Sequence, residues 1–206
     1  GKNPAYLKYS AAHSTIILDN TNISEIKESG FQRDFVKKVY FEKKDDEKLQ
    51  ILSGTHNGYV KNFKKICKRS LFVNKEKELL RGEDTIISTK SIVKKNVYHI
   101  RFHLMPEIST TMTENKKNII IKTKKNNIWM FRSNKEMVIE KSIFVRDDIA
   151  NETTQIVISG VTSSLKTKVE WSLEKIWKEM HLYLFTTNLH YKKYAVYLIN
   201  IILELY

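Results

Sequence analysis

The sequence predicts an all-β protein, an antiparallel β-sandwich that ends in a short helical tail. Three observations support this prediction. Apolar and polar residues alternate with a period of two along most of the chain, turn-forming residues recur at short intervals, and no rhythm of strands and crossover helices appears before residue 170. Many half-buried strands without crossover helices are typical of a sandwich or a barrel, and 206 residues suffice for one such core.

The expected strands can be placed in order along the chain. The first covers residues 14–18, is entered at His13, and ends at the turn-forming residues 19–22. The polar residues 124–127 join two later strands into a predicted hairpin. The further strands are expected at residues 35–41, 49–53, 60–73, 85–87, 97–104, 118–123, 128–132, 137–145 and 154–159.

The chain divides into a sandwich domain, residues 1–175, and a helical or partly disordered tail, residues 176–206. Residues 170–180 are compatible with a helix, and apolar side chains after residue 181 recur at helical spacing. The apolar run is too short for a membrane span, which needs about 20 residues. Two interpretations of the tail remain open: an amphipathic helix that packs on the sandwich, and a segment foreign to the domain.

The composition limits the possible partners. The net charge is +13, but it comes from 30 lysines and only 6 arginines, dispersed along the chain, beside 24 isoleucines and 15 asparagines. Recognition of nucleic acids favours arginine, so we expect no nucleic-acid partner. The positive field favours an acidic polysaccharide or another anionic surface. The single cysteine, Cys67, excludes an internal disulfide and is expected in the core.

Three residues are candidates for a functional site. His13 stands at the entry of the first strand, where an imidazole either satisfies a hydrogen bond or binds a metal ion. His56 and Tyr59 flank the turn-forming pair Asn57-Gly58, which could make their side chains converge. The pair therefore either stabilises the turn or contacts a substrate. His103, on a strand, is expected to be a hydrogen-bonded histidine of the sheet.

Five short blocks carry a family resemblance. They are His-Ser-Thr-Ile-Ile-Leu-Asp at 13–19, Thr-His-Asn-Gly-Tyr at 55–59, Arg-Ser-Leu-Phe-Val followed by Leu-Leu-Arg-Gly-Glu-Asp within 69–84, Arg-Phe-His-Leu-Met-Pro at 101–106, and Ile-Val-Ile-Ser-Gly followed by Lys-Val-Glu-Trp-Ser-Leu within 156–173. In this order they resemble the C-terminal β-sandwich domain of heparinase II/III family polysaccharide lyases, especially the alphaproteobacterial type. The usual Asp of the second block is replaced by Asn57.

The resemblance implies a parent enzyme that cleaves uronic-acid polysaccharides by β-elimination. This reaction needs a neutralised uronate carboxylate, a base for the C5 proton and an acid for the leaving oxygen. In the family these groups lie in an N-terminal α/α toroid, which this chain does not show, so no catalytic residue is carried over. We expect this chain alone to be inactive.

The resemblance also implies a metal site, partners and a compartment. His13 matches a family histidine that helps to hold a metal ion, commonly zinc, with ligands that would precede Gly1, so the site is expected to be incomplete here. The implied partners are an acidic polysaccharide and the toroid, and the implied location is the periplasm or cell envelope. The alternative is a non-catalytic carbohydrate- or anion-binding β-sandwich module.

Overall fold

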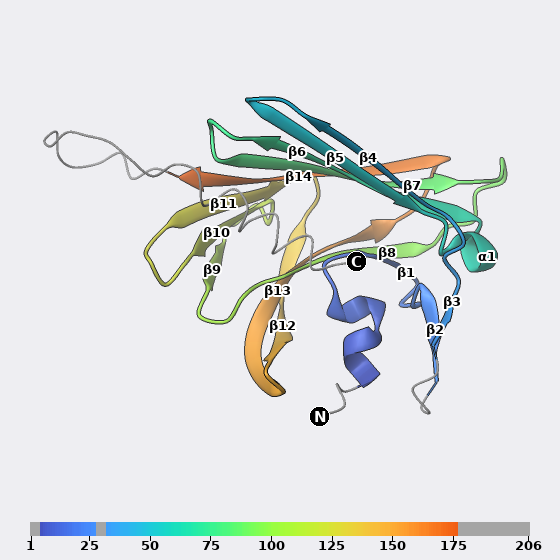
Figure 1. Ribbon diagram of the computed structural model, residues 1–206, viewed down its shortest axis with the longest axis horizontal. Helices are drawn as coiled ribbons and strands as arrows, with labels where there is room; N and C mark the ends of the chain where they lie inside the picture. The colour runs from blue at the N-terminus through green and yellow to red at the C-terminus, as the bar shows by residue number, and fades with distance from the viewer. Residues whose placement is uncertain (1–4, 28–31, 177–206) are drawn as a thin grey trace, which may run out of the picture.

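A computed structural model describes residues 5–27 and 32–176 of the chain. It shows two packed antiparallel sheets (Figure 1), which confirms the predicted sandwich. The larger sheet contains, in spatial order, β4 (Val39–Asp45), β5 (Leu49–His56), β6 (Lys65–Asn74), β7 (Leu79–Ser88), β14 (Lys166–Ile176), β11 (Ile128–Ser133), β10 (Asn118–Lys122) and β9 (Ser109–Met112). The smaller sheet contains β1 (Ile16–Leu18), β8 (Val97–His103), β13 (Ile149–Val161) and β12 (Met137–Arg146).

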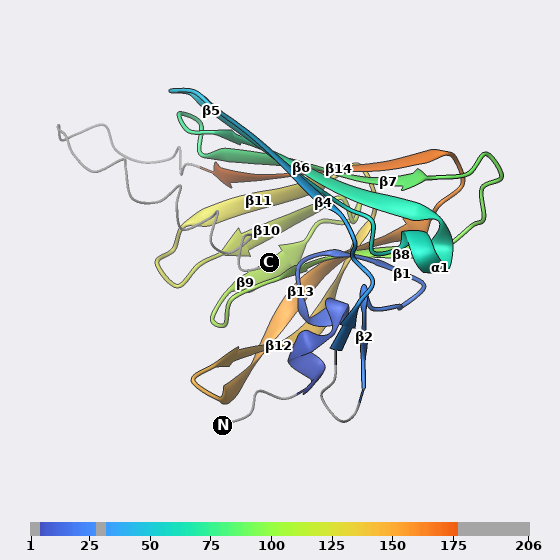
Figure 2. The same cartoon turned by 45° about the vertical axis from the view of Figure 1, so that its right-hand side comes forward.

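Short elements complete the described chain. Two 3₁₀ turns, η1 (Ala5–Lys8) and η2 (Ser10–Ala12), precede β1. A two-stranded sheet of β2 (Ser24–Ile26) and β3 (Gln32–Asp34) follows it, and the single helical turn α1 (Val60–Phe63) connects β5 to β6. Turned by 45°, the molecule shows η1, η2 and the β2–β3 pair beside the smaller sheet and beneath the larger one (Figure 2).

Several strand and helix assignments differ from the sequence prediction. The strands expected at residues 35–41 and 85–87 are β4, Val39–Asp45, and β7, Leu79–Ser88. The first strand begins at Ile16 instead of residue 14, because Ser14 is used to bind β8: its hydroxyl accepts a hydrogen bond from the His103 N–H at 2.9 Å. The segment 60–73 is not one strand, since α1 ends at Lys64 in a left-handed conformation with φ 57° before β6 begins. The hairpin is confirmed, with Lys122 of β10 opposite Ile128 of β11.

The helix expected from residue 170 is wrong as far as Ile176. Residues 166–176 form β14, which pairs with β7 on one side and β11 on the other. Alternation explains the difference, because Val169 and Trp171 are buried while Lys168 and Glu170 are exposed. Tertiary pairing therefore overrides the local helical pattern. The predicted tail, apart from Ile176, lies outside the described residues.

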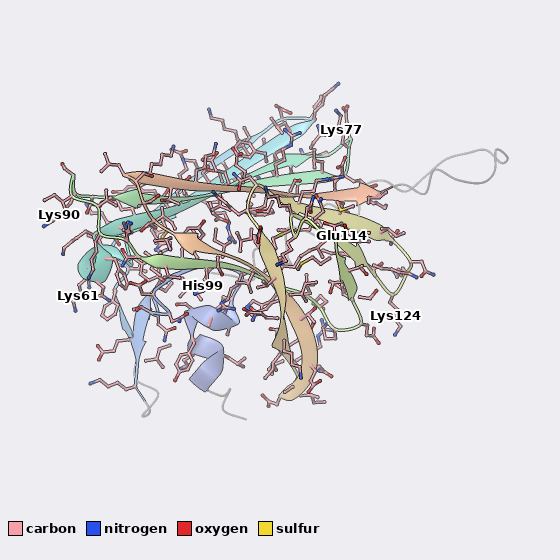
Figure 3. The ribbon with its side chains drawn as sticks, turned by 180° about the vertical axis from the view of Figure 1, so that it is seen from behind. Lys61, Lys77, Lys90, His99, Glu114 and Lys124 are labelled. Carbon is pink, nitrogen blue, oxygen red and sulfur yellow. The ribbon has the colours of Figure 1, made fainter. Side chains whose placement is uncertain are left out.

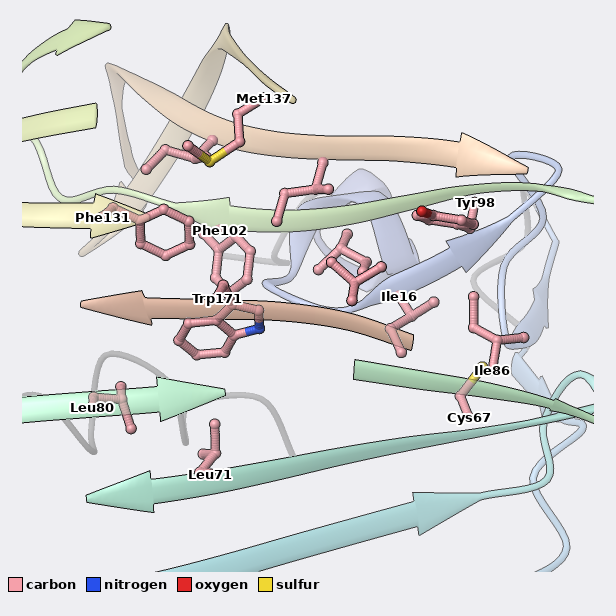
Figure 4. Close-up of a cluster of buried hydrophobic side chains, with 14 of the residues drawn as sticks. Ile16, Cys67, Leu71, Leu80, Ile86, Tyr98, Phe102, Phe131, Met137 and Trp171 are labelled. Carbon is pink, nitrogen blue, oxygen red and sulfur yellow. The ribbon is translucent and has the colours of Figure 1, made fainter. Parts of the chain in front are cut away.

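The core lies between the sheets and centres on three aromatic rings. Phe102 of β8, Phe131 of β11 and Trp171 of β14 have ring centroids 4.7–5.7 Å apart, and all three are buried (Figure 4). Gly82 of β7 is required here, because a Cβ on it would meet the Trp171 ring at 2.1 Å. Cys67 is also buried in this core, as predicted.

A polar network connects the core to the N-terminal segment. The Arg69 Nε donates to the Asp84 Oδ1 at 2.7 Å and the Arg69 Nη2 to the Oδ2 at 3.0 Å, while the Trp171 Nε1 donates to the same Oδ2 at 2.9 Å. The Arg69 Nη1 also donates to the carbonyl oxygen of Ser14. The guanidinium thereby ties β6 to the entry of β1 and fixes one wall of a pocket beside β4 and β5.

Candidate ligand pocket

The eight-stranded sheet is wider than the four-stranded sheet, and its inner face is left partly uncovered at β4 and β5. Val39 and Phe41 of β4 lie opposite His56 and Gly54 of β5, so their side chains share the inner face with Leu52. Val39 is 58% exposed and Phe41 is 63% exposed. An apolar surface of this kind at the end of a sheet indicates a place where another group packs.

A pocket of ≈ 330 Å³ lies between this face and the N-terminal segment. Its walls are mostly apolar, with a few polar side chains among them, which is the usual character of a ligand pocket. The lining includes Lys8, His13, Phe41, Leu52, His56 and Arg69. We call it the N-terminal pocket.

The structure brings His13 and His56, which are 43 residues apart in sequence, to this one pocket. His56 is at the end of β5 and its Nδ1 accepts the Gly58 N–H at 3.3 Å. Burial lowers the pKa of His56 to about 4, so its ring is neutral near pH 7. Since Nδ1 accepts a hydrogen bond, the proton of the neutral ring is on Nε2, which acts as a donor.

Tyr59 does not line the pocket, although the turn does bring it near His56, with 6.0 Å between the ring centroids. Its side chain is fully buried, and its hydroxyl donates to the Thr21 carbonyl oxygen at 2.9 Å and lies 3.3 Å from that of Ile16. Asn57 stabilises the same turn, because its Oδ1 accepts hydrogen bonds from two backbone N–H groups at 2.8 and 3.0 Å. This geometry places Tyr59 in the core, where it anchors β1.

Three positively charged residues that the sequence analysis did not single out line the pocket: Lys8, Lys68 and Arg69. Lys8 in η1 is exposed and has no ion pair among the described residues. Arg69 is held by Asp84, which offsets much of its charge. Arg69 belongs to the third block of the family resemblance, within residues 69–84. Its proximity to His13, however, depends on a contact between β6 and residue 14 that no local pattern encodes.

The described residues do not fit a complete zinc site. No group of three or more His, Cys, Asp or Glu side chains in residues 5–27 and 32–176 converges in the way that zinc requires. To act as a ligand through either ring nitrogen, the neutral His56 ring would have to give up its hydrogen bond from the Gly58 N–H. The prediction that His13 binds zinc together with residues outside this chain stays a prediction.

His103 is a structural histidine, as expected. Its Nε2 lies 3.1 Å from the carbonyl oxygen of Ala11 and therefore carries a proton, while its Nδ1 lies 2.7 Å from the Ser142 hydroxyl. Burial lowers the pKa of His103 to about 4. The ring thus joins η2 to β12 as a neutral bridge.

The fold and the pocket together define a β-sandwich module with a small basic and apolar cavity at its uncovered end. Residues 2–172 match the family described as "Heparinase II/III-like, C-terminal". The chain therefore belongs to this family of C-terminal domains. A comparison with curated proteins finds no match.

Solved structures agree on the fold. The heparan sulfate lyase HepC from Pedobacter heparinus matches with a TM-score of 0.65 and 14% identity, over 82% of this chain and 25% of that chain. A heparinase III gene product matches with a TM-score of 0.62 and 11% identity, over 81% of this chain and 24% of that one. This chain thus spans about a quarter of the length of these relatives. Among the described residues, no helix is long and apolar enough to cross a membrane.

Proposed function

We propose that this chain is the C-terminal β-sandwich part of a heparinase II/III-like polysaccharide lyase and that it contributes substrate contacts without catalytic groups. The observation that supports this most is the N-terminal pocket, where His13, His56 and Lys8 border an uncovered sheet face. The imidazole N–H of His56 and the Lys8 ammonium are donors suited to a uronate carboxylate. Catalytic groups would be supplied by an α/α toroid in the parent protein.

The same uncovered face offers a surface for the toroid. Val39 and Phe41 present apolar side chains beside the pocket, and the matched part of this chain covers only 25% of the HepC chain. In this arrangement the sandwich would both support the toroid and line one side of the cleft. The alternative is a non-catalytic carbohydrate- or anion-binding module, which the same pocket would serve without a toroid.

A binding experiment with the 206-residue chain tests the pocket. A heparan sulfate tetrasaccharide should bind, and Lys8→Gln and His13→Gln should each weaken the affinity severalfold. Lys90→Gln, an exposed lysine outside the pocket that removes the same charge as Lys8→Gln, is the matched control. Equal affinities for all four proteins would contradict a role of the pocket.

An elimination assay tests the division of labour. The chain alone should release no unsaturated uronate from heparan sulfate or alginate, followed by ultraviolet absorbance. The full-length parent protein should release it, and release by the chain alone would contradict the assignment of catalysis to the toroid. Binding by the chain with no activity in the full-length protein would favour the alternative module.

A further inference from the structure

The opposite, outer face of the eight-stranded sheet carries a second hollow. Many of its lining residues alternate along four adjacent strands, at positions 72 and 74 of β6, 79, 81 and 83 of β7, 170 and 172 of β14, and 132 of β11; the intervening residues 82, 133 and 171 also border it. Side chains two apart on a strand point to one face, and here they point away from Leu71, Asp84 and Trp171 in the core. The hollow is an open groove of ≈ 760 Å³, which we call the outer groove.

Two arginines, one on each side of a serine, form a row across this groove. Arg81 lies opposite Ser172, and Ser172 lies opposite Arg132 in the next strand pair. With neighbouring strands about 4.8 Å apart, the two arginine backbones are roughly 10 Å apart. Arg132 donates to Glu174 at 2.7 Å, whereas Arg81 is exposed and has no partner among the described residues.

Most of the carboxylate and amide oxygens of the groove are already engaged, with Glu83 and Glu170 sharing one lysine. Lys168 forms ion pairs with Glu83 at 2.6 Å and with Glu170 at 2.8 Å. The side-chain oxygen of Asn74 accepts two backbone N–H groups, and that of Asn134 accepts the Glu170 N–H at 3.1 Å. The side-chain NH₂ groups of both asparagines and the Arg81 guanidinium remain without partners in the described part of the chain. The groove therefore offers mainly donors.

An aromatic ring extends the donor row. Phe72 lies opposite Arg81 and is half-buried in the groove lining. A partly exposed ring beside a guanidinium and amide donors provides an apolar surface for the face of a sugar ring and polar groups for its substituents. A free anion alone would make no use of the ring.

We propose that the outer groove binds an acidic oligosaccharide, with a carboxylate or sulfate at Arg81 and a sugar ring on Phe72. Planar guanidinium groups suit both anions because they donate two parallel hydrogen bonds. The site is on the opposite face of the sheet from the N-terminal pocket, so it does not depend on the function proposed for that pocket. It would hold a second stretch of an acidic polysaccharide.

The test compares variants of the full chain by titration with a heparan sulfate tetrasaccharide, followed by backbone amide NMR. The amides of Arg81 and Ser172 should shift on binding. Arg81→Gln should weaken the affinity recorded by these two amides about tenfold, as expected for loss of one charge-assisted contact. Phe72→Leu, which keeps an apolar side chain, should weaken it severalfold.

Three controls separate this site from general attraction to a basic protein. Lys90→Gln removes the same charge far away, since Lys77 beside the groove and Lys90 lie at opposite ends of the molecule (Figure 3). Lys8→Gln should leave the tetrasaccharide affinity recorded by the groove amides unchanged. The neutral sugar cellotetraose should not shift the groove amides.

Several outcomes would overturn the proposal. These are unshifted Arg81 and Ser172 amides at saturation, equal weakening by Arg81→Gln and Lys90→Gln, or cellotetraose binding as tightly as the acidic sugar. Inorganic sulfate that shifts these amides with the affinity of the tetrasaccharide would reduce the groove to a simple anion site. Melting temperatures of Arg81→Gln and Phe72→Leu within a few degrees of the parent chain would confirm that the variants are folded.

Discussion

Replacement of Asp84 by alanine should be among the most destabilising single changes in the sandwich. The Asp84 side chain is fully buried, and the side chain of Arg69 is only 14% exposed. The change removes both carboxylate hydrogen bonds of Arg69 and the acceptor of the Trp171 N–H. It leaves a largely buried guanidinium without its counter-ion, which costs about 3–5 kcal/mol.

This loss would be a large part of a total stability of about 5–15 kcal/mol. Urea unfolding followed by tryptophan fluorescence measures the free energy of unfolding for each variant. Asp84→Asn should lie between the parent chain and Asp84→Ala, because its amide oxygen still accepts one hydrogen bond. Glu107→Ala is the control, since it breaks an exposed ion pair with Lys124 that is worth about 0–1 kcal/mol. A cost for Asp84→Ala within about 1 kcal/mol of that control would refute this account of the network.

Three further predictions concern the histidines and Tyr59. Burial lowers the pKa of His56 from the usual 6.5 to about 4, so between these pH values the unfolded chain binds more protons than the folded chain. The free energy of unfolding should therefore fall as the pH falls from about 6.5 to about 4. Urea unfolding at pH 7 and pH 5 should show a smaller difference in His56→Gln than in the parent chain. Tyr59→Phe removes a buried hydroxyl donor to Thr21 and should lower the unfolding free energy by about 1–2 kcal/mol, with tetrasaccharide affinity unchanged; reduced affinity at equal folding would restore Tyr59 as a sugar contact. The chain alone should bind zinc weakly in a competition with a chelator, whereas tight one-to-one binding lost in His13→Ala would show that the site is complete within this chain.

The sandwich could be predicted because its strands carry their signal locally. Alternation in residues 118–122 and 128–132 and the polar turn between them were sufficient to place β10 and β11. The end of β14 could not be predicted in the same way. Residues 170–176 suit a helix by local spacing, and pairing with β7 and β11 decides for a strand.

The candidate pocket was predictable only in part. The sequence singled out His13 and His56 separately, but their convergence depends on contacts such as that of Arg69 with Ser14, over 55 residues of sequence. The turn around Asn57-Gly58 was recognised, whereas the inward direction of Tyr59 was not. That direction depends on α1, which begins directly after Tyr59 and turns its ring into the core beneath β1.

Two features of the eight-stranded sheet account for the two candidate sites. On the inner side, four strands cannot cover eight, so β4 and β5 extend beyond β1 and the N-terminal turns fill only part of the space. On the outer side, long charged side chains flank the short Ser172 in the middle of the sheet, and the groove follows from that difference in length. Because β6 contributes Arg69 to one face and Phe72 to the other, the alternation that builds the core also separates the two sites. A ligand in either site would therefore contact strands that the Arg69–Asp84–Trp171 network already holds in place.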